Sequence, residues 1–288
     1  MKKDLLSLKD LTKKNIEKVF EMTKKLKGKR TKYLFEKTLV LYFEKPSTRT
    51  VVSFWVAMVE LGGDAIFLTP NEMQIGRGET IADTANVLSR YADGIVARTF
   101  KHETIVDLAK YASVPVINGL SDLYHPCQIL ADIFTVLEKK KTLNLNFAWV
   151  GDGNNVCNTW IEAAKILNFK LVVAIPKGYE PKEKLGKVKL THNPEEAVKD
   201  ADVIITDTWV SMGEEKEAKM RDKVFKQFQI NSKLVKSAKP NYLFMHCLPA
   251  HRGFEVTTEI IDGKHSIVFD EAENRLHIQK AILYLLMK

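Results

Sequence analysis

The chain has 288 residues, of which 45% are hydrophobic and 28% are charged, a balance that is typical of folded globular proteins and excludes a disordered chain. Its 44 Lys and Arg residues outnumber its 36 Asp and Glu residues, and the net charge of +8 suits nucleic acid, a membrane surface or a small anionic substrate. No run of about 18 apolar residues is present, so we expect no membrane-spanning helix.

Short apolar runs, rich in β-branched and aromatic residues, alternate along the chain with longer helical patterns. In chain order, the runs that predict strands are residues 38–43, 65–68, 94–97, 114–118, 145–151, 170–175, 203–207, 242–247 and 266–270. The patterns that predict helices are residues 51–61, 79–91, 129–139, 155–167 and 272–287. Most predicted strands are apolar throughout, as expected where helices cover both faces of a parallel sheet. This alternation predicts an α/β fold with parallel sheets.

The basic segment 138–141 marks the predicted boundary between two domains, because the alternation of strands and helices restarts at Leu145. We expect two doubly wound parallel-sheet domains joined by helices, at residues 1–138 and 139–270. The last helix, 271–288, is amphipathic and is expected to pack back onto the first domain. Alternatively, the lysines at 139–141 are only the solvated end of a helix, where cations suit the helix dipole.

The ends and cysteines of the chain predict a cytoplasmic protein. The charged N-terminus leads into an apolar stretch, residues 5–8, that is too short for a signal peptide. The cysteines, Cys127, Cys157 and Cys247, are odd in number and cannot form a disulfide framework.

The segment between the first predicted strand and the helix after it carries hydroxyl groups and an arginine. Ser47, Thr48, Arg49 and Thr50 lie where the backbone N–H groups of a helix start are free and the helix dipole is positive. Hydroxyl donors and a guanidinium there complete a cradle for phosphate. The alternative is a Ser or Thr helix cap beside an exposed arginine, but one capping residue would suffice for that. We therefore favour an anion site.

Further polar residues lie at the ends of predicted elements in the first half of the chain. His125 precedes Pro126, which suits the first turn of a helix, and it shares a helix face with Gln128. Their N–H groups could hold a carbonyl or carbamoyl group, although a capping cluster explains them equally well. Arg98 follows the strand at 94–97, at the end where α/β sheets bind ligands. An unremarkable exposed arginine is the alternative there.

The segment 151–156 follows a predicted strand, opens a helix and begins like a dinucleotide-binding fingerprint. However, Val156 replaces the third glycine, and Pro176 and Lys177 stand near the position where a ribose-binding acid is expected. Dinucleotide binding is therefore not expected. Paired amides at the end of a strand suit a zwitterionic ligand better.

Asp207 and Cys247 each end a predicted strand. The Asp207 carboxylate could pair with an ammonium group, with Ser211 adding a hydrogen bond, or it could simply cap the local backbone. Cys247 could be a buried small hydrophobe, a zinc ligand with His246 and His251, or a polar partner of a substrate. Adjacent residues on an extended strand point to opposite faces, and no Cys-x-x-Cys spacing occurs, so we expect no metal site.

Stretches along nearly the whole chain resemble the aspartate and ornithine carbamoyltransferases, and they occur in the same order. They are Ser47-Thr48-Arg49-Thr50, His125-Pro126-Cys127-Gln128, Asp207-Thr208-Trp209-Val210-Ser211-Met212-Gly213 and His246-Cys247-Leu248-Pro249. The last two are similar to the ornithine branch of the family. The resemblance implies an enzyme that transfers the carbamoyl group of carbamoyl phosphate to the δ-amine of L-ornithine. The products would be L-citrulline and phosphate, in arginine metabolism. Arginine biosynthesis is the expected setting, and the sequence leaves the reverse, catabolic direction open.

The resemblance also implies roles for the site residues. Those expected to bind carbamoyl phosphate are Ser47, Thr48, Arg49, Thr50, Gln74, Arg98, His125, Gln128, Cys247, Leu248 and Arg275. Those expected to bind ornithine are Asn155, Asp207, Ser211 and Met212. The expected catalytic residues among these are Arg98, His125, Asp207 and Cys247. Whether Asp207 or Cys247 takes the proton from the amine stays open.

Gln74 lies in a polar, glycine-spaced loop, residues 71–80, that could be a plain surface loop. By resemblance, the loop reaches into the site of a neighbouring subunit, so Gln74 would contact phosphate there, in a homotrimer or a multiple of one. Met73 stands where relatives often have serine, and the local hydrogen bonding of the loop is expected to differ. No lysine occupies position 74, which argues against the aspartate branch.

The expected partners are therefore carbamoyl phosphate, L-ornithine and further copies of the chain, with no cofactor, metal, nucleic acid or membrane. One alternative is a carbamoyltransferase for another amine, such as aspartate, putrescine or N-acetylornithine. Another is a basic nucleic-acid-binding α/β protein. That protein would gather Lys and Arg on one face with aromatic residues between them. Here they are spread along the chain and are densest at 13–29 and 139–141.

Overall fold

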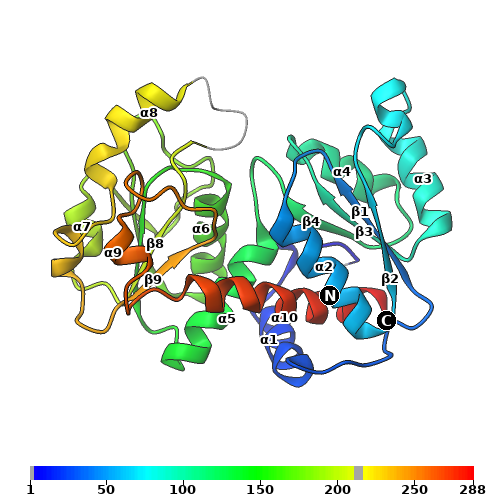
Figure 1. Ribbon diagram of the computed structural model, residues 1–288, viewed down its shortest axis with the longest axis horizontal. Helices are drawn as coiled ribbons and strands as arrows, with labels where there is room; N and C mark the ends of the chain where they lie inside the picture. Colours follow the sequence, from blue (N-terminus) through cyan, green and yellow to red (C-terminus); the bar gives the residue numbers. More distant parts are fainter. Residues whose placement is uncertain (1–2, 211–216) are drawn as a thin grey trace. The chain divides into compact units, whose positions relative to one another are not determined.

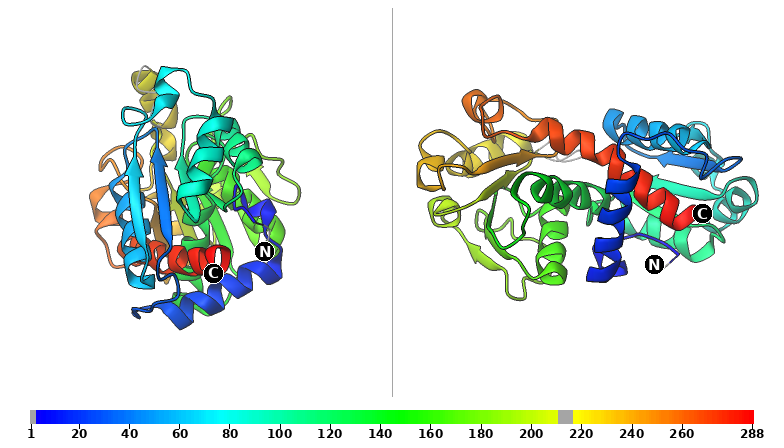
Figure 2. Two further views of the ribbon diagram at one scale, coloured as in Figure 1. Left: turned by 90° about the vertical axis from the view of Figure 1, so that its right-hand side faces the viewer. Right: turned by 90° about the horizontal axis from the view of Figure 1, so that it is seen from below.

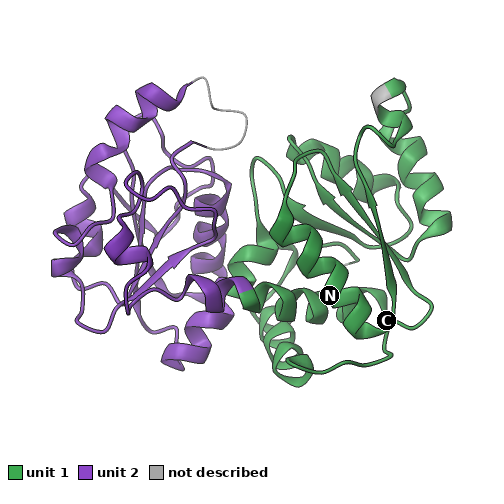
Figure 3. Ribbon diagram, viewed as in Figure 1, with its two compact units in different colours: residues 1–131, 273–288 green, residues 132–272 purple. Residues whose placement is uncertain are grey.

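The computed structural model of the protein describes residues 3–210 and 217–288. The chain forms two compact units: unit 1 comprises Met1–Ala131 and Glu273–Lys288, and unit 2 comprises Asp132–Ala272 (Figure 3). The bounds of the units fall inside two helices, α5 (Pro126–Lys140) and α10 (Val268–Met287). The first unit therefore takes its last helical segment from the C-terminal end of the chain.

Unit 1 is built on a 4-stranded parallel sheet with the strand order β2-β1-β3-β4 (Figure 1). Its strands are β1 (Thr38–Phe43), β2 (Asp64–Leu68), β3 (Gly94–Arg98) and β4 (Val116–Leu120). Its helical elements before α5 are η1 (Leu8–Asp10), α1 (Lys13–Leu26), α2 (Thr48–Leu61), η2 (Gln74–Arg77), α3 (Ile81–Tyr91) and α4 (His102–Tyr111). In the central pairing, Leu39 of β1 lies opposite Ala65 of β2 and Gly94 of β3.

The central strands of unit 1 are buried, as their apolar sequences predict. One face of the sheet packs Val40 and Ile95 against Ala85 of α3 and Leu108 of α4. The edge strand β2 differs, because Ile66 is 49% exposed. An apolar sequence therefore did not guarantee burial at the edge of this sheet.

Unit 2 is built on a 5-stranded parallel sheet with the strand order β7-β6-β5-β8-β9. Its strands are β5 (Asn146–Val150), β6 (Lys170–Ala174), β7 (Lys189–Thr191), β8 (Val203–Thr206) and β9 (Leu243–His246). Its helical elements between α5 and α10 are α6 (Asn155–Leu167), α7 (Pro194–Val198), α8 (Ala218–Phe225), η4 (Lys226–Phe228), η5 (Leu234–Ser237) and α9 (Thr258–Ile261). Helices lie along each of the sheets in the further views (Figure 2).

Both faces of the unit 2 sheet are covered by large apolar side chains. On one face, Ala148 and Ile204 pack with Val198 of α7 and Ile260 of α9. Elsewhere in the unit, Phe147 of β5 meets Trp160 of α6, with ring centroids 5.7 Å apart. Two-sided burial of this kind is why the strand sequences are apolar throughout instead of alternating.

The predicted α/β fold with two parallel sheets is confirmed, but one predicted strand is wrong. Residues 266–270 do not form a strand, because only an isolated bridge joins Ser266 to Phe244 and α10 begins at Val268. Ile267 and Val268 make a short apolar run, which periodicity alone cannot assign to strand or helix. Asp270 and Glu271 in the first turn suit a helix N-terminus, and they are the signal that favoured the helix.

Within the described part of the chain, no helix combines the length and the apolar character that crossing a bilayer requires.

Candidate active site

Each sheet has a place where the strand order changes direction. In unit 1 it lies between β1 and β3, and in unit 2 it lies between β5 and β8. Parallel α/β sheets bind ligands outside the carboxyl ends of the strands at such a point. The predicted site residues follow these same strands: Ser47–Thr50 come after β1, Arg98 ends β3, and Asp207 comes after β8.

The loop after β1 places Ser47 at the start of α2. Ser47 is the N-cap residue, and its Oγ accepts a hydrogen bond of 3.3 Å from the backbone N–H of Thr50. The same Oγ donates to Thr50 Oγ1 at 3.0 Å. Thr48 and Arg49 occupy the first turn beside them. The predicted helix cap and the predicted cluster of hydroxyls at a helix N-terminus are thus both present.

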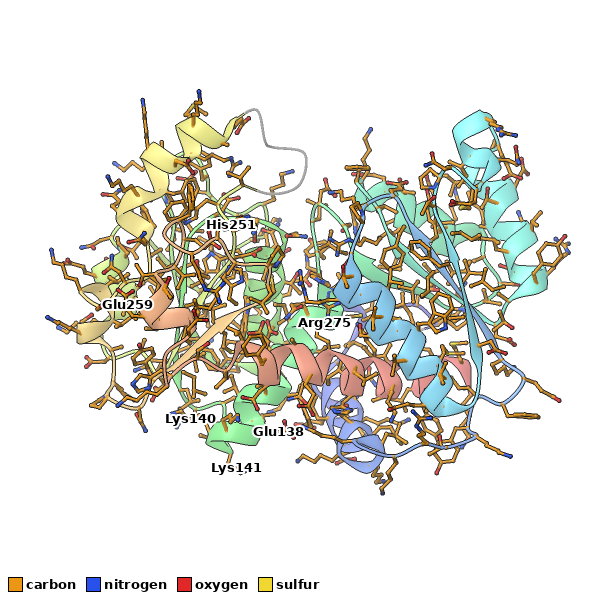
Figure 4. All side chains as sticks on the ribbon, in the orientation of Figure 1. Glu138, Lys140, Lys141, His251, Glu259 and Arg275 are labelled. Atoms are coloured by element: carbon orange, nitrogen blue, oxygen red, sulfur yellow. The ribbon has the colours of Figure 1, made fainter. Side chains whose placement is uncertain are left out.

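Arg275 joins this helix start to two further helices of unit 1. It projects from α10 (Figure 4) and is only 4% exposed. Its Nη2 donates to Thr50 Oγ1 at 2.8 Å, and its Nη1 donates to Gln128 Oε1 on α5, also at 2.8 Å. The structure therefore brings together three predicted carbamoyl-phosphate residues that are far apart in the sequence.

His125 is buried immediately before α5, close to several arginines. The pKa of its imidazole lies well below the usual range, because burial disfavours the charged form and Arg275, Arg98 and Arg49 add repulsion. His125 is therefore neutral near pH 7. A neutral imidazole can still donate a hydrogen bond to a carbonyl oxygen. Arg98, also buried, ends β3 in the same unit.

Gln74 lies outside this hydrogen-bonded cluster. It is exposed at the start of η2, whereas its neighbour Met73 is 8% exposed and packs into the core below α3. Apolar packing of Met73 thus anchors the loop.

In unit 2, Asp207 accepts hydrogen bonds from residues on both sides of the boundary between β5 and β8, where the strand order changes. Its Oδ2 accepts from Asn154 Nδ2 at 2.8 Å, and its Oδ1 accepts from Cys247 Sγ at 3.1 Å. Asn154 also caps α6, accepting from the backbone N–H of Val156 and Cys157. The predicted residue Asn155 follows it as the first residue of α6.

Cys247 is a protonated thiol in this environment. The pKa of the thiol lies well above its usual range, because burial disfavours the thiolate and the carboxylates of Asp207 and Glu271 repel it. The thiol therefore donates to Asp207 and does not serve as a base near neutral pH. Of the two groups left open by the sequence, Asp207 is the hydrogen-bond acceptor and Cys247 the donor.

Asp207, His246 and Cys247 could in principle hold a metal, because one potential ligand atom from each lies within 4.8 Å of the others. The expectation that His246 and Cys247 point apart is wrong, because Cys247 lies just beyond the end of β9. The imidazole is nevertheless engaged at both nitrogens. Its Nδ1 accepts from Leu248 N at 2.9 Å, and its Nε2 lies 3.1 Å from Glu255 Oε1. A metal would have to displace one of these bonds.

Two predicted ornithine residues, Ser211 and Met212, lie outside the described residues. Leu248, predicted to offer a backbone group, adopts a φ of 57°, in the left-handed region that few residues other than glycine adopt. Its N–H is fixed by His246, as described above, so the backbone of this residue has a defined direction.

Sequence reasoning counted Asn154 only as one of the paired amides and gave it no separate role in this site. The available signal was its position: an Asn directly before a predicted helix is a favoured N-cap, and its remaining N–H groups then point away from the helix. Asp152 and Arg221 in the same unit were also missed. A salt bridge between residues 69 positions apart has no signal in a single sequence.

These features define a class of protein with two parallel α/β units. One unit has a helix start with hydroxyl groups bonded to a buried arginine, and the other has a carboxylate–amide pair, each at the carboxyl ends of the strands. The family model of the aspartate/ornithine carbamoyltransferase carbamoyl-P binding domain matches residues 3–138, and that of the Asp/Orn binding domain matches residues 143–286. The chain belongs to the aspartate/ornithine carbamoyltransferase family. The predicted family resemblance is confirmed.

Similar proteins cover the whole chain. The ornithine carbamoyltransferase of Pyrococcus abyssi is 55% identical over 99% of this chain and 96% of its own length. The anabolic ornithine carbamoyltransferase of Pyrococcus furiosus is 54% identical over the same shares. Among solved structures, the P. furiosus enzyme matches with a TM-score of 0.95 over 99% of this chain and 96% of that one. The Thermus thermophilus enzyme, 44% identical, matches with a TM-score of 0.94 over 100% of both chains.

Proposed function

We propose that the protein transfers the carbamoyl group of carbamoyl phosphate to the δ-amine of L-ornithine, giving L-citrulline and phosphate in the biosynthesis of arginine. The observation that carries the donor half is the buried Arg275, which is bonded to Thr50 at the start of α2 and to Gln128. A guanidinium, a helix N-terminus and an amide together suit an acyl phosphate whose acyl part is a carbamoyl group. Ornithine as the acceptor is supported by relatives named ornithine carbamoyltransferase, which are 55% and 54% identical to this chain.

In the donor site, Ser47, Thr48, Arg49 and Thr50 hold the phosphate. The N-terminal end of α2 supplies free N–H groups and positive potential, and Arg49 supplies a full charge. These groups stabilise the phosphate more strongly as it leaves, because it then gains negative charge.

The carbamoyl group needs separate contacts. Gln128 is proposed to hold its amide, while Arg98, Thr50 and the neutral His125 would stabilise the negative charge that develops on its oxygen. Loss of one such donor typically lowers the rate about 10²–10³-fold. The backbone of Leu248 and the Cys247 thiol complete the proposed contacts to this group.

The amine of ornithine must lose its proton before it attacks, since a free lysine-like amine has a pKa of about 10.4. Asp207 accepts two hydrogen bonds and is the proposed partner of the ammonium and acceptor of the proton. Asn155 would hold the α-carboxylate, with Ser211 and Met212 completing the pocket. Positioning and electrostatics carry the reaction, with no cofactor and no covalent intermediate.

We further propose that the protein works in the cytoplasm as a homotrimer or a multiple of one, with no nucleic acid or membrane as partner. An exposed apolar face on unit 1 supports association. On α2, Val52, Trp55 and Val59 are 53%, 41% and 46% exposed, and they lie at helical spacing. Ile66 and Phe67 on the edge strand β2 of the same unit are also exposed. In such an assembly, Gln74 would contact phosphate bound to the neighbouring subunit.

The test is a turnover assay with carbamoyl phosphate against L-ornithine, putrescine, N-acetyl-L-ornithine and L-aspartate. We expect citrulline from ornithine and little product from the others. Arg49→Ala should lower kcat/KM for carbamoyl phosphate by at least about 10²-fold. Parent-like rates for Arg49→Ala at limiting carbamoyl phosphate would refute the phosphate site. Salt-sensitive binding to DNA or RNA without transferase activity would favour the nucleic-acid alternative instead.

A further inference from the structure

A buried arginine in unit 2, Arg221, is not used by the reaction proposed above. It lies on α8 and is 7% exposed. Its Nη1 donates to Asp152 Oδ2 at 3.0 Å and to the carbonyl oxygen of Trp209 at 2.9 Å. Its Nε donates to Glu217 Oε2 at 3.2 Å. One guanidinium is thus bonded to several separate parts of the chain.

The two buried partners of Arg221 belong to the loops on either side of the place where the strand order of unit 2 changes. Asp152 follows β5, and Trp209 follows β8. Asp152 is itself only 6% exposed, and its carbonyl oxygen accepts a 3.0 Å bond from Trp149 Nε1. Arg221 therefore joins the two loops through hydrogen bonds.

The same two loops carry the proposed acceptor site. Asn154 comes two residues after Asp152 and donates to Asp207, which comes two residues before Trp209. A change in the spacing of the loops would alter the Asn154–Asp207 bond. It would also move Asn155, the proposed contact to the α-carboxylate.

Close packing leaves these groups little freedom to adjust. The guanidinium carbon of Arg221 lies 5.0 Å from the ring centroid of Tyr179 and 5.9 Å from that of Phe225. The N–H of Gly153 donates to the carbonyl oxygen of Tyr179 at 3.1 Å, and a Cβ on Gly153 would lie only 2.3 Å from that oxygen. Only glycine fits at that approach, so the loop after β5 is held between Arg221 and the Tyr179 backbone.

A buried ion pair alone is weak evidence for stability, because apolar residues of similar size can often replace it. The guanidinium of Arg221 donates hydrogen bonds to acceptors on two loops and lies over aromatic rings. Only arginine offers a planar group with this set of donors. We propose that Arg221 is a positioning residue for the acceptor site, acting through Asp152 and the Trp209 carbonyl. The proposal rests on the function proposed above and deepens it.

The experiment compares Arg221→Lys with the parent in steady-state citrulline formation. Lysine keeps the charge but cannot supply the planar fork. We expect KM for ornithine to rise roughly tenfold or more, because small displacements of positioning groups are costly. KM for carbamoyl phosphate should stay within about twofold, since the phosphate-binding residues of unit 1 are untouched and neither Cys247 nor Leu248 belongs to the two loops. The inhibition constant of L-norvaline, which has the α-groups of ornithine but no δ-amine, should rise in parallel.

The matched control is Arg252→Lys, which alters an exposed arginine of unit 2 that pairs with Asp262 and touches neither loop. In Arg252→Lys, the KM values for both substrates should equal those of the parent.

If Arg221→Lys does not fold, Asp152→Asn is used in its place, because asparagine keeps the shape of the loop and removes only the charge of the acceptor. A lower melting temperature with an unchanged ornithine KM would overturn the proposal. An equal rise in both KM values would also overturn it.

The two proposals fail in different ways. Absence of citrulline formation by the parent protein would contradict the proposed function. A parent-like ornithine KM in the folded Arg221 and Asp152 variants would contradict only the positioning role.

Discussion

His125 illustrates how burial and neighbouring charges set the protonation state of one residue. Burial lowers the pKa of its imidazole, and the guanidinium groups of Arg275, Arg98 and Arg49 lower it further. In the unfolded chain the same imidazole would titrate near the usual value of about 6.5. Between these two pKa values, unfolding takes up a proton. The free energy of unfolding must therefore fall as the pH falls through this range, and the full stability is present above it.

We predict that His125→Gln weakens this acid dependence. The parent should lose stability steadily between about pH 6.5 and the lowered pKa of the folded state, whereas the variant should lose less over the same range. Some dependence remains in both, because burial also lowers the pKa of His102 and His277. Urea unfolding followed by circular dichroism at a series of pH values measures the slope. His251→Gln, which removes an exposed histidine, is the control. Equal slopes in the parent and His125→Gln would contradict the prediction.

At the scale of elements, Glu44 ties the loop after β1 to the loop after β3. Its Oε2 accepts from the backbone N–H of Phe100 at 2.7 Å, and its own N–H donates to the carbonyl oxygen of Arg98 at 2.8 Å. Its Oε1 accepts from the Tyr42 hydroxyl at 2.8 Å. Lys45 adds a contact between the loops, with Nζ 4.5 Å from the Phe100 ring centroid. The two strand ends that carry the proposed phosphate and oxyanion residues are thus held in register.

We predict that Glu44→Gln raises KM for carbamoyl phosphate roughly tenfold, because the amide can accept only one of the two bonds and loses the charge. KM for ornithine should change less, since the altered loops belong to unit 1. Glu103→Gln, an exposed carboxylate in the first turn of α4, is the matched control. Steady-state kinetics with each substrate varied in turn gives both constants. A carbamoyl phosphate KM equal to that of the control would exclude this role for Glu44.

Elements were predictable from the sequence where their patterns were long or bounded by clear signals. The helix at 155–167 and the strand at 38–43 were predicted with their observed bounds, because a capping Asn or a continuous apolar run marks them. The three-residue strand β7 and the helix α4 were not predicted. β7 is too short to show a period. Residues 266–270 show the opposite error, in which the apolar start of a helix resembles a strand.

The site was predictable only in part for a physical reason. Residues such as Ser47 and Asp207 sit at the ends of strands, where topology alone brings polar groups together. Arg275 could be placed only through the family resemblance, and Asn154 only through its capping position. The link from Arg221 to Asp152 depends on packing between distant segments, which a single sequence does not encode in any local pattern.

At the scale of the whole molecule, association would serve catalysis if Gln74 acts on a neighbouring subunit. Exposed Val52, Trp55 and Val59 on α2 give the first unit an apolar surface of the kind that marks interfaces. Gln74 is exposed in the same unit, on η2, outside the cluster around Arg275. If an active site takes residues from two subunits, variants that lack different residues can complement each other, whereas variants of a monomer cannot.

We predict that two inactive variants regain activity when they are mixed. Arg49→Ala removes a group from a subunit's own site, and Gln74→Ala removes the group that the subunit would lend to its neighbour. After denaturation and joint refolding of equal amounts, random assembly places an intact Arg49 beside an intact Gln74 in about one quarter of the sites. Activity should therefore rise to about a quarter of that of the refolded parent, while each variant refolded alone stays low. If each site were complete within one chain, mixing would restore nothing.

Light scattering tests the same assembly directly. If the active parent protein had the molar mass of a single chain, the homotrimer would be contradicted, because a monomer has no neighbour to receive Gln74.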